Sequence, residues 1–229
     1  MGFLANRSVN ETTMKSRIRT IIVLLAAWFL IAPQYSHAAT STARSLALKL
    51  PVAAENGAGY KRAAFTLWID ADHDGCDTRQ EVLIAESKVK PTIESKCKIT
   101  AGKWISWYDN KTWTKPADVD IDHVVPLKEA WDSGARVWTK ANRTRYANDL
   151  DFSWSLDAVT DNVNSSKGDR DPADWLPPLT STHCSYAIHW VAVKYRWRLN
   201  TDSREQKKLL SILSGTCGSL IITIPARAI

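Results

Sequence analysis

The sequence lacks the patterns that commonly bind structural zinc. It contains four cysteines and five histidines among 229 residues, and no two cysteines stand in a C-x-x-C spacing. Small zinc sites usually need such pairs, because four thiolate or imidazole ligands must reach one ion. The chain also has no internal repeat and no long low-complexity stretch, and it is long enough to bury a proper core.

No apolar run is long enough to cross a bilayer comfortably. The longest, from Ile21 to Ala32, has twelve residues. Basic residues precede it, and Ser36-His37-Ala38 follows it as a small-x-small cleavage pattern. We predict a secretory signal peptide over residues 1–38, with an uncleaved membrane anchor as the alternative. The mature protein is then expected to be secreted or periplasmic and not to contact the membrane.

The charge of the mature chain is only mildly positive. Without residues 1–38 the chain keeps 26 basic and 23 acidic residues, a net charge of +3. This balance permits contact with a polyanion without requiring it, since local clustering decides phosphate binding. One basic cluster either follows a phosphate backbone or forms a solvated helix face; its members are Arg136, Lys140, Arg143 and Arg145.

The four cysteines all lie in the exported part of the chain. An even number of cysteines in an oxidising compartment favours two disulfides over free thiols. Four cysteines allow three pairings. The pairing Cys76–Cys97 with Cys184–Cys217 is favoured, because each bond closes a short loop around one apparent element.

The hydrophobic pattern predicts one α+β domain with small β elements early and helices late. Residues 39–59, rich in Ala, Ser and Gly, are predicted to be a flexible lead-in to a domain over residues 60–229. From Asp118 the chain alternates polar and apolar side chains as a strand does, until it reaches Val124-Val125. The further elements expected are a hairpin at 103–113 and helices at 127–134, 161–168, 184–199 and 203–213.

A strand end in "DVDIDHVVPLKEAW" places Asp122 beside His123. A carboxylate at this point could hold a divalent cation, while the imidazole accepts a proton from water. Histidine suits that task because its ordinary pKa lies near neutrality. The neighbouring Asp118 and Asp120 are expected to be surface or loop residues.

Three later residues add to this pair. Asn164 and Lys167 are three positions apart and so share one helix face. The amide oxygen of Asn164 could be a second metal ligand, and Lys167 suits a phosphate. Asn148, between the two motifs, could brace the loop that carries His123. The alternative is that these asparagines only cap helices and form turns.

The segment "DADHDGCDTRQE" at 70–81 has the acid spacing of an EF-hand loop, with acids at positions 1, 3, 5 and 12. The residues before it read as a strand rather than as an EF-hand's entering helix. Three interpretations stay open, namely a bound Ca²⁺, acids that serve an active site, and a solvated turn fastened by Cys76. This second acidic group consists of Asp70, Asp72, Asp74, Asp77 and Glu81.

Two residues of the same segment are predicted to face a catalytic cleft. Arg79 could hold a substrate phosphate through its guanidinium. Glu81 could then fix that arginine in place. The sequence therefore offers two phosphate-binding candidates, Arg79 and Lys167.

The strings "DVDIDHVVPLKEAWDSGA", "YANDL" and "AVTDNVNSSKGDRDPADWLPP" resemble the HNH, or ββα-metal, nucleases. More closely, they are similar to small secreted bacterial HNH-type nucleases related to the C-terminal domain of the GmrSD restriction enzymes. The resemblance covers residues 60 to 217 and rests on several separated motifs in the family's order. It implies a metal-dependent endonuclease with a ββα-metal core. Together with the cysteine count and the helical patterns, the predicted fold is α+β, with that core, two disulfides and additional C-terminal helices.

The resemblance also implies a role for each residue of the motifs. His123 matches the general base, Asp122 and Asn164 match metal ligands, and Asn148 matches the central asparagine that orients the base. Asp122 and Asn164 stand where the founding HNH pattern has histidines, a substitution also seen in the HNH domain of RNA-guided effector nucleases. Oxygen ligands favour Mg²⁺ or Mn²⁺ over zinc.

The function predicted from the sequence is a secreted, metal-dependent endonuclease that hydrolyses phosphodiester bonds of DNA, with RNA left open as a further substrate. No sequence-reading module accompanies the nuclease motifs, so we expect low sequence specificity. We expect a monomer. The alternative from another class is a non-catalytic, calcium-dependent binding module of the cell surface, built around residues 70–81.

Overall fold

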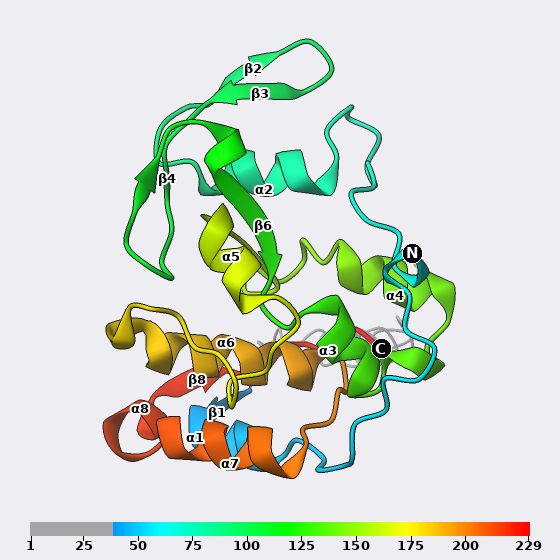
Figure 1. Cartoon of the computed structure of the whole chain (residues 1–229), viewed down its shortest axis with the longest axis vertical. Coiled ribbons are helices and arrows are strands. Elements are labelled where there is room, and N and C mark those ends of the chain that lie inside the picture. Colours follow the sequence, from blue (N-terminus) through cyan, green and yellow to red (C-terminus); the bar gives the residue numbers. More distant parts are fainter. Residues whose placement is uncertain (1–38) are drawn as a thin grey trace, which may run out of the picture. The chain divides into compact units, whose positions relative to one another are not determined.

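The computed structural model describes residues 39–229, and the predicted signal peptide at 1–38 lies outside the described residues (Figure 1). Within residues 39–229, short antiparallel strands mix with helices, as the α+β prediction requires. No helix in that part of the chain is long and apolar enough to cross a membrane.

The strands pair in short antiparallel sheets. The pairs are β1 (Thr40–Thr42) with β8 (Ile221–Thr223), β2 (Thr92–Glu94) with β3 (Lys98–Ala101), β4 (Trp104–Ile105) with β5 (Thr112–Trp113), and β6 (Val119–His123) with β7 (Leu156–Thr160). The helices are α1 (Ala43–Leu48), α2 (Thr78–Glu86), α3 (Leu127–Asp132), α4 (Lys140–Ala147), α5 (Asp161–Lys167), α6 (His183–Arg196), α7 (Ser203–Ile212) and α8 (Gly215–Ser219). The predicted hairpin and the predicted helices are therefore present.

The predicted flexible lead-in is wrong over its first half. Strand β1 pairs with β8 at the other end of the domain, and Thr42 caps α1 by accepting a hydrogen bond from the Ser45 amide at 3.1 Å. Helix α1 buries Leu46 completely and packs against α6, α7 and α8. The small residues of this segment suit close helix packing, but only a distant part of the chain provides the surface that makes them ordered.

The buried apolar residues form two clusters. The larger surrounds α6, where Tyr186, Trp190 and Val191 are fully buried. The smaller joins α2 to β3, β4, β6 and β7, with Leu83, Trp104 and Ile121 at its centre. Both favoured disulfides are present, Cys76–Cys97 beside the smaller cluster and Cys184–Cys217 between α6 and α8.

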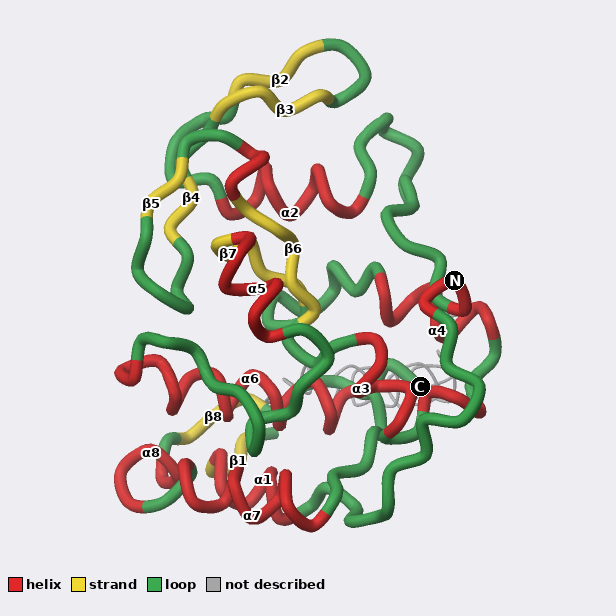
Figure 2. Tube along the Cα trace, in the orientation of Figure 1, coloured by secondary structure: helices red, strands yellow, loops and turns green. Residues whose placement is uncertain are grey.

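Strands β6 and β7 and helix α5 form the part of the fold that carries the nuclease motifs. Asp122 lies opposite Asp157 and His123 lies opposite Leu156 in the antiparallel register. Strand β7 runs directly into α5, which contacts both strands and lies against β6 in Figure 2. The strand end at Asp122 and the helix that bears Asn164 are therefore neighbours.

Candidate active site

One pocket of about 200 Å³ brings together three of the predicted site residues. Asp122 and His123 enter it from the end of β6, and Asn164 enters it from α5. Ser165, Asp169 and Arg62 complete its polar lining. Asp122 and His123 are 5% and 7% exposed, so the pocket is the route by which solvent reaches them.

The imidazole of His123 is oriented by a backbone carbonyl. Its Nε2 lies 2.9 Å from the carbonyl oxygen of Ala147, and because a carbonyl only accepts, Nε2 carries the hydrogen. Nδ1 makes no hydrogen bond with a described residue and is not fully enclosed by protein, so its lone pair is open to the pocket. Burial lowers the pKa of His123 to about 4. The ring is therefore neutral near pH 7 and can accept a proton through Nδ1.

The two oxygens of Asp122 have different surroundings. Oδ2 accepts hydrogen bonds from the Tyr108 hydroxyl at 2.6 Å and from Lys167 Nζ at 2.5 Å. Oδ1 has no hydrogen-bond partner among the described residues and is not fully enclosed, so it remains available in the pocket. Burial raises the pKa of Asp122, while Lys167 and Tyr108 act in the opposite direction and favour the carboxylate.

Lys167 does not occupy the position predicted for a phosphate-binding residue. Its side chain is fully buried, and its ammonium also donates to the backbone oxygen of His123 at 2.8 Å. Burial lowers the pKa of Lys167, and the adjacent Asp122 opposes that shift. The helical spacing placed Asn164 and Lys167 on one face correctly, but the longer side chain of Lys167 extends inward and compensates the charge of Asp122.

Asn164 is held by a residue that the sequence did not single out. Its Nδ2 donates to Asp120 Oδ2 at 3.2 Å. A carboxylate can only accept, so the amide nitrogen faces Asp120 and Asn164 Oδ1 is left free. Asp120 was expected to be a surface or loop residue; it lies in β6, is half-buried, and contacts Asn164. The available signal was the strand period, which puts Asp120 and Asp122 on the same face of β6.

Asn148 is not among the residues that line this pocket, and its side chain makes no hydrogen bond to His123. Its Nδ2 donates to the backbone oxygens of Thr66 and Thr144, both at 2.7 Å. Its Oδ1 accepts from the Ile69 amide at 3.2 Å. Asn148 therefore ties the segment before the acidic loop to α4, whereas the neighbouring Ala147 carbonyl orients the base.

Arg79 and Glu81 also lie away from the pocket of Asp122. The guanidinium of Arg79 donates to the backbone oxygens of Pro116 and Val119, at 3.1 and 3.0 Å. This contact fixes the start of β6. Glu81 makes no ion pair with Arg79; burial and the nearby carboxylates of the 70–81 loop raise its pKa. The predicted Arg79–Glu81 phosphate site is therefore not formed.

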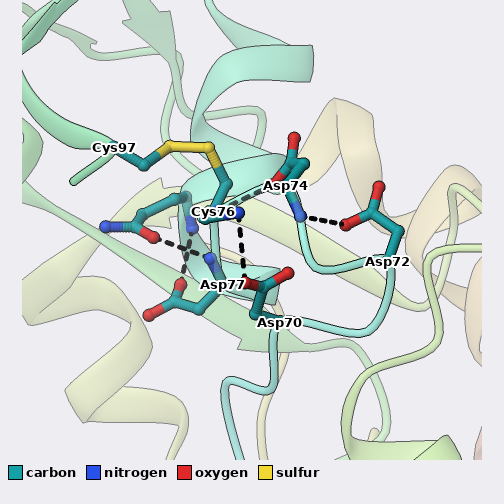
Figure 3. Close-up of a disulfide and its surroundings, with 8 residues drawn as sticks. Asp70, Asp72, Asp74, Cys76, Asp77 and Cys97 are labelled. Atoms are coloured by element: carbon teal, nitrogen blue, oxygen red, sulfur yellow. Dashed lines mark hydrogen bonds between the residues drawn. A yellow bond between two sulfur atoms is a disulfide. The ribbon is translucent and has the colours of Figure 1, made fainter. Parts of the chain in front are cut away.

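The acids of the 70–81 loop fold around their own backbone (Figure 3). Asp70, Asp72 and Asp74 accept hydrogen bonds from the amides of Gly75, Asp74 and Cys76 at 3.1, 3.4 and 2.7 Å. One oxygen of each of these three acids lies within 4.8 Å of the others, and Asp70 Oδ1 is buried without a hydrogen-bond partner. Asp77 has a separate role, because it caps α2 by accepting from the Gln80 amide at 2.9 Å.

Arg62 is the pocket residue that sequence reasoning missed. It lies in a single 3-10 turn before the acidic loop and lines the pocket together with Asp122 and His123. Its positive charge adds to the burial that lowers the pKa of His123. No local pattern around Arg62 distinguished it from other surface arginines.

Comparison with known proteins agrees with these motifs. A model of the family described as "GmrSD restriction endonucleases, C-terminal domain" matches residues 77–212. An uncharacterized secreted protein of Arthroderma benhamiae is 45% identical over 178 residues, which cover 77% of this chain and 85% of the relative. No solved structure matches. The prediction of a secreted protein is confirmed, whereas a restriction to bacteria is not supported, because this relative is fungal.

Proposed function

This chain belongs to the family of the GmrSD restriction endonuclease C-terminal domains, and from that premise we propose that it is a secreted, metal-dependent endonuclease of the ββα-metal type. Its substrate is DNA, with RNA as a second candidate, cleaved with little sequence preference. One observation supports this most directly. Asp122, His123 and Asn164 line a single pocket, and each keeps one atom without a hydrogen bond to a described residue, namely Oδ1 of Asp122, Nδ1 of His123 and Oδ1 of Asn164.

In the proposed reaction, His123 activates a water molecule. Nδ1 accepts one proton of the water, and the resulting hydroxide attacks phosphorus. The bond from phosphorus to the leaving ester oxygen breaks, and that oxygen takes a proton from solvent. The Ala147 carbonyl, 2.9 Å from Nε2, keeps the ring oriented and stabilises the imidazolium that forms.

Asp122 and Asn164 are the residues that would hold the metal. Both offer oxygen ligands, one charged and one neutral, and this donor set suits Mg²⁺ or Mn²⁺ better than zinc. Such a cation supplies positive charge for the developing negative charge on the phosphate. Lys167 and Tyr108 maintain Asp122 as a carboxylate from the buried side, and Asp120 keeps the amide of Asn164 turned so that its oxygen is free.

Digestion of plasmid DNA by the purified mature protein tests this proposal. We expect nicking and linearisation with Mg²⁺ or Mn²⁺, none with EDTA, and recovery when the metal is restored in excess. Gel electrophoresis over a time course measures the rate. The absence of cleavage of double-stranded DNA, single-stranded DNA and RNA with either metal would contradict the proposal.

The calcium-dependent binding module remains the second candidate, because the oxygens of Asp70, Asp72 and Asp74 lie within 4.8 Å of one another. It differs from the nuclease in two measurable ways. Calcium would raise the melting temperature, and no nucleic acid would be cut with any metal. Metal-dependent cleavage therefore rejects the binding module as the whole function, whatever the effect of calcium on melting.

Arg62 is proposed to contact the substrate phosphate in place of Arg79 and Lys167. Its exposed guanidinium lines the same pocket as Asp122 and His123, so it can add positive charge beside the reacting phosphate. We expect Arg62→Ala to lower kcat/KM for plasmid cleavage by about 10²-fold, the effect typical of losing one donor to a developing charge. Steady-state cleavage rates over a range of DNA concentrations measure it.

Arg136→Ala is the matched control for this variant. Arg136 is an exposed arginine outside the pocket. Its replacement lowers the net charge by the same amount as Arg62→Ala but leaves the pocket unchanged. Arg62→Lys should recover part of the lost activity. Equal rates for Arg62→Ala and Arg136→Ala would exclude Arg62 from phosphate binding.

A further inference from the structure

A hairpin arm rich in lysine stands apart from the candidate active site. Residues 88–103, which include β2 and β3, contain five lysines, one acid and no arginine. Figure 1 shows β2 and β3 at the end of the domain away from α1 and α7. None of these lysines lines the pocket of Asp122 and His123. We call this segment the lysine arm; its lysines are Lys88, Lys90, Lys96, Lys98 and Lys103.

Most of the positive charge on the lysine arm is not neutralised by protein. All five lysines are exposed, and among residues 39–229 only Lys98 has an acidic partner, Glu94 at 3.1 Å. That pair is itself on the surface, where ion pairs contribute little. The other four ammonium groups face solvent without an ion pair to a described residue.

The lysine arm is anchored both at its turn and at its base. The disulfide Cys76–Cys97 ties the start of β3 to the beginning of α2, and the Lys88 amide donates to the Lys103 oxygen at 2.7 Å. Ile99 of β3 is buried in the smaller apolar cluster. The lysines are therefore presented on a fixed hairpin rather than on a free loop, which lowers the entropic cost of binding a partner.

The side chains of the basic cluster predicted at 136–145 are less free to move than those of the lysine arm. Arg143 donates to the Ala64 oxygen at 3.2 Å and lies over the ring of Trp131. Arg145 donates to the Ala228 oxygen at 3.0 Å. Two of the four residues of that cluster are thus held against the domain by these contacts, whereas the lysines of the arm other than Lys98 make no side-chain contact of this kind with a described residue.

We propose that the lysine arm binds the phosphate backbone of nucleic acid and holds the substrate at a surface separate from the pocket. Lysine ammonium groups act as point charges that contact phosphates without reading bases. The hairpin tip has no aromatic side chain on which a base could stack. The choice of nucleic acid over other polyanions rests on the proposed nuclease function.

An anionic membrane is the competing partner, because Val89 and Ile93 are about half exposed on the same arm. Membrane-binding segments usually present a continuous apolar face with Trp, Phe or Leu beside the basic residues. The lysine arm offers two separate aliphatic side chains and no such face. The arrangement therefore favours a solvated phosphate backbone.

Binding without cleavage tests the proposal. A short fluorescein-labelled DNA duplex is titrated with the full mature protein in EDTA, and fluorescence anisotropy gives Kd at several salt concentrations between about 50 and 200 mM. The triple variant Lys88→Gln/Lys90→Gln/Lys96→Gln removes three unpaired charges. We expect its Kd at low salt to rise by about tenfold or more and the slope of log Kd against log salt to fall by about 2 to 3.

A charge-matched variant controls for the loss of net charge. Lys49→Gln/Lys207→Gln/Lys208→Gln removes three lysines outside the lysine arm, one at the C-terminal end of α1 and two in the middle of α7. Its Kd and salt slope should stay within twofold of wild type. Equal losses in the two triple variants would overturn the proposal. Unchanged DNA binding by the arm variant, together with lost binding to phosphatidylserine vesicles, would assign the lysine arm to a membrane instead.

The two proposals fail in different ways. Arm-dependent binding without cleavage in any metal would refute the nuclease and leave the lysine arm as a nucleic-acid surface. Metal-dependent cleavage with normal binding by the arm variant would refute only the lysine arm.

Discussion

Replacing His123 by alanine is expected to slow metal-dependent plasmid cleavage by about 10²–10⁴-fold, the contribution typical of a positioned general base. The neutral imidazole donates from Nε2 to the Ala147 oxygen at 2.9 Å and leaves Nδ1 as the only acceptor of the ring. Within residues 39–229, no other histidine lines this pocket. Single-turnover cleavage rates at saturating Mg²⁺ measure the loss, and added imidazole should recover part of the rate by acting as an external base.

His189→Ala separates loss of the base from loss of a buried ring. Both histidines stack on a tryptophan: His189 on Trp154, with ring centroids 4.4 Å apart, and His123 on Trp68, at 5.8 Å. Unlike His123, His189 lies outside the pocket. Both variants lose aromatic packing, so both should unfold at lower temperature. Only the His123 variant should lose cleavage while folded. Undiminished cleavage by His123→Ala would remove His123 from its proposed role.

The sequence alone predicted the pocket residues that lie on a regular strand or helix. Asp122 and His123 are adjacent on a strand, and Asn164 follows from the helix that starts after the next strand. Strand and helix periods fix which residues share a face, so spacing alone could bring these three together. The same periods do not fix how far a long side chain extends. Lys167 was therefore assigned correctly to its helix face but wrongly to a phosphate.

The parts that the sequence could not predict depend on distant contacts. Arg79 donates to two carbonyls nearly forty residues later in the chain, and Arg62 reaches the pocket from an isolated 3-10 turn. The order of residues 40–48 depends on β8 and α6. No local period encodes such contacts, because each needs the packed domain to bring its partner close.

The short segment "YANDL" shows how a packed domain supports the base. Tyr146 donates from its hydroxyl to the Val125 oxygen, and the Ala147 carbonyl holds His123. Asn148 connects to the segment at 66–69. Asp149, the next residue, fixes the end of this segment by accepting four hydrogen bonds. Its donors are Ser155 at 2.9 Å, Arg196 at 2.8 and 2.9 Å, and Trp197 at 2.8 Å.

Asp149→Ala is accordingly expected to lower the free energy of unfolding by about 3–5 kcal/mol, the usual cost of breaking a buried ion pair. The Asp149 side chain is 2% exposed and that of Arg196 is 8% exposed, so the variant leaves a buried guanidinium without its bidentate partner. Urea unfolding measures the loss. Because Asp149 anchors the chain two residues after Ala147, the folded variant should also cleave more slowly. We expect kcat to fall while KM changes little.

Asp151→Ala is the matched control, since it removes a carboxylate that approaches the same arginine. Asp151 lies 3.9 Å from Arg196, but its side chain is 90% exposed. Water therefore screens the pair, and its removal should change stability by no more than about 0.5 kcal/mol. Similar losses in the two variants would show that net charge, rather than the buried network, stabilises this segment. We expect only Asp149→Ala to lose stability and, while folded, to cleave more slowly. That result would show that the orientation of His123 depends on the Asp149–Arg196 pair.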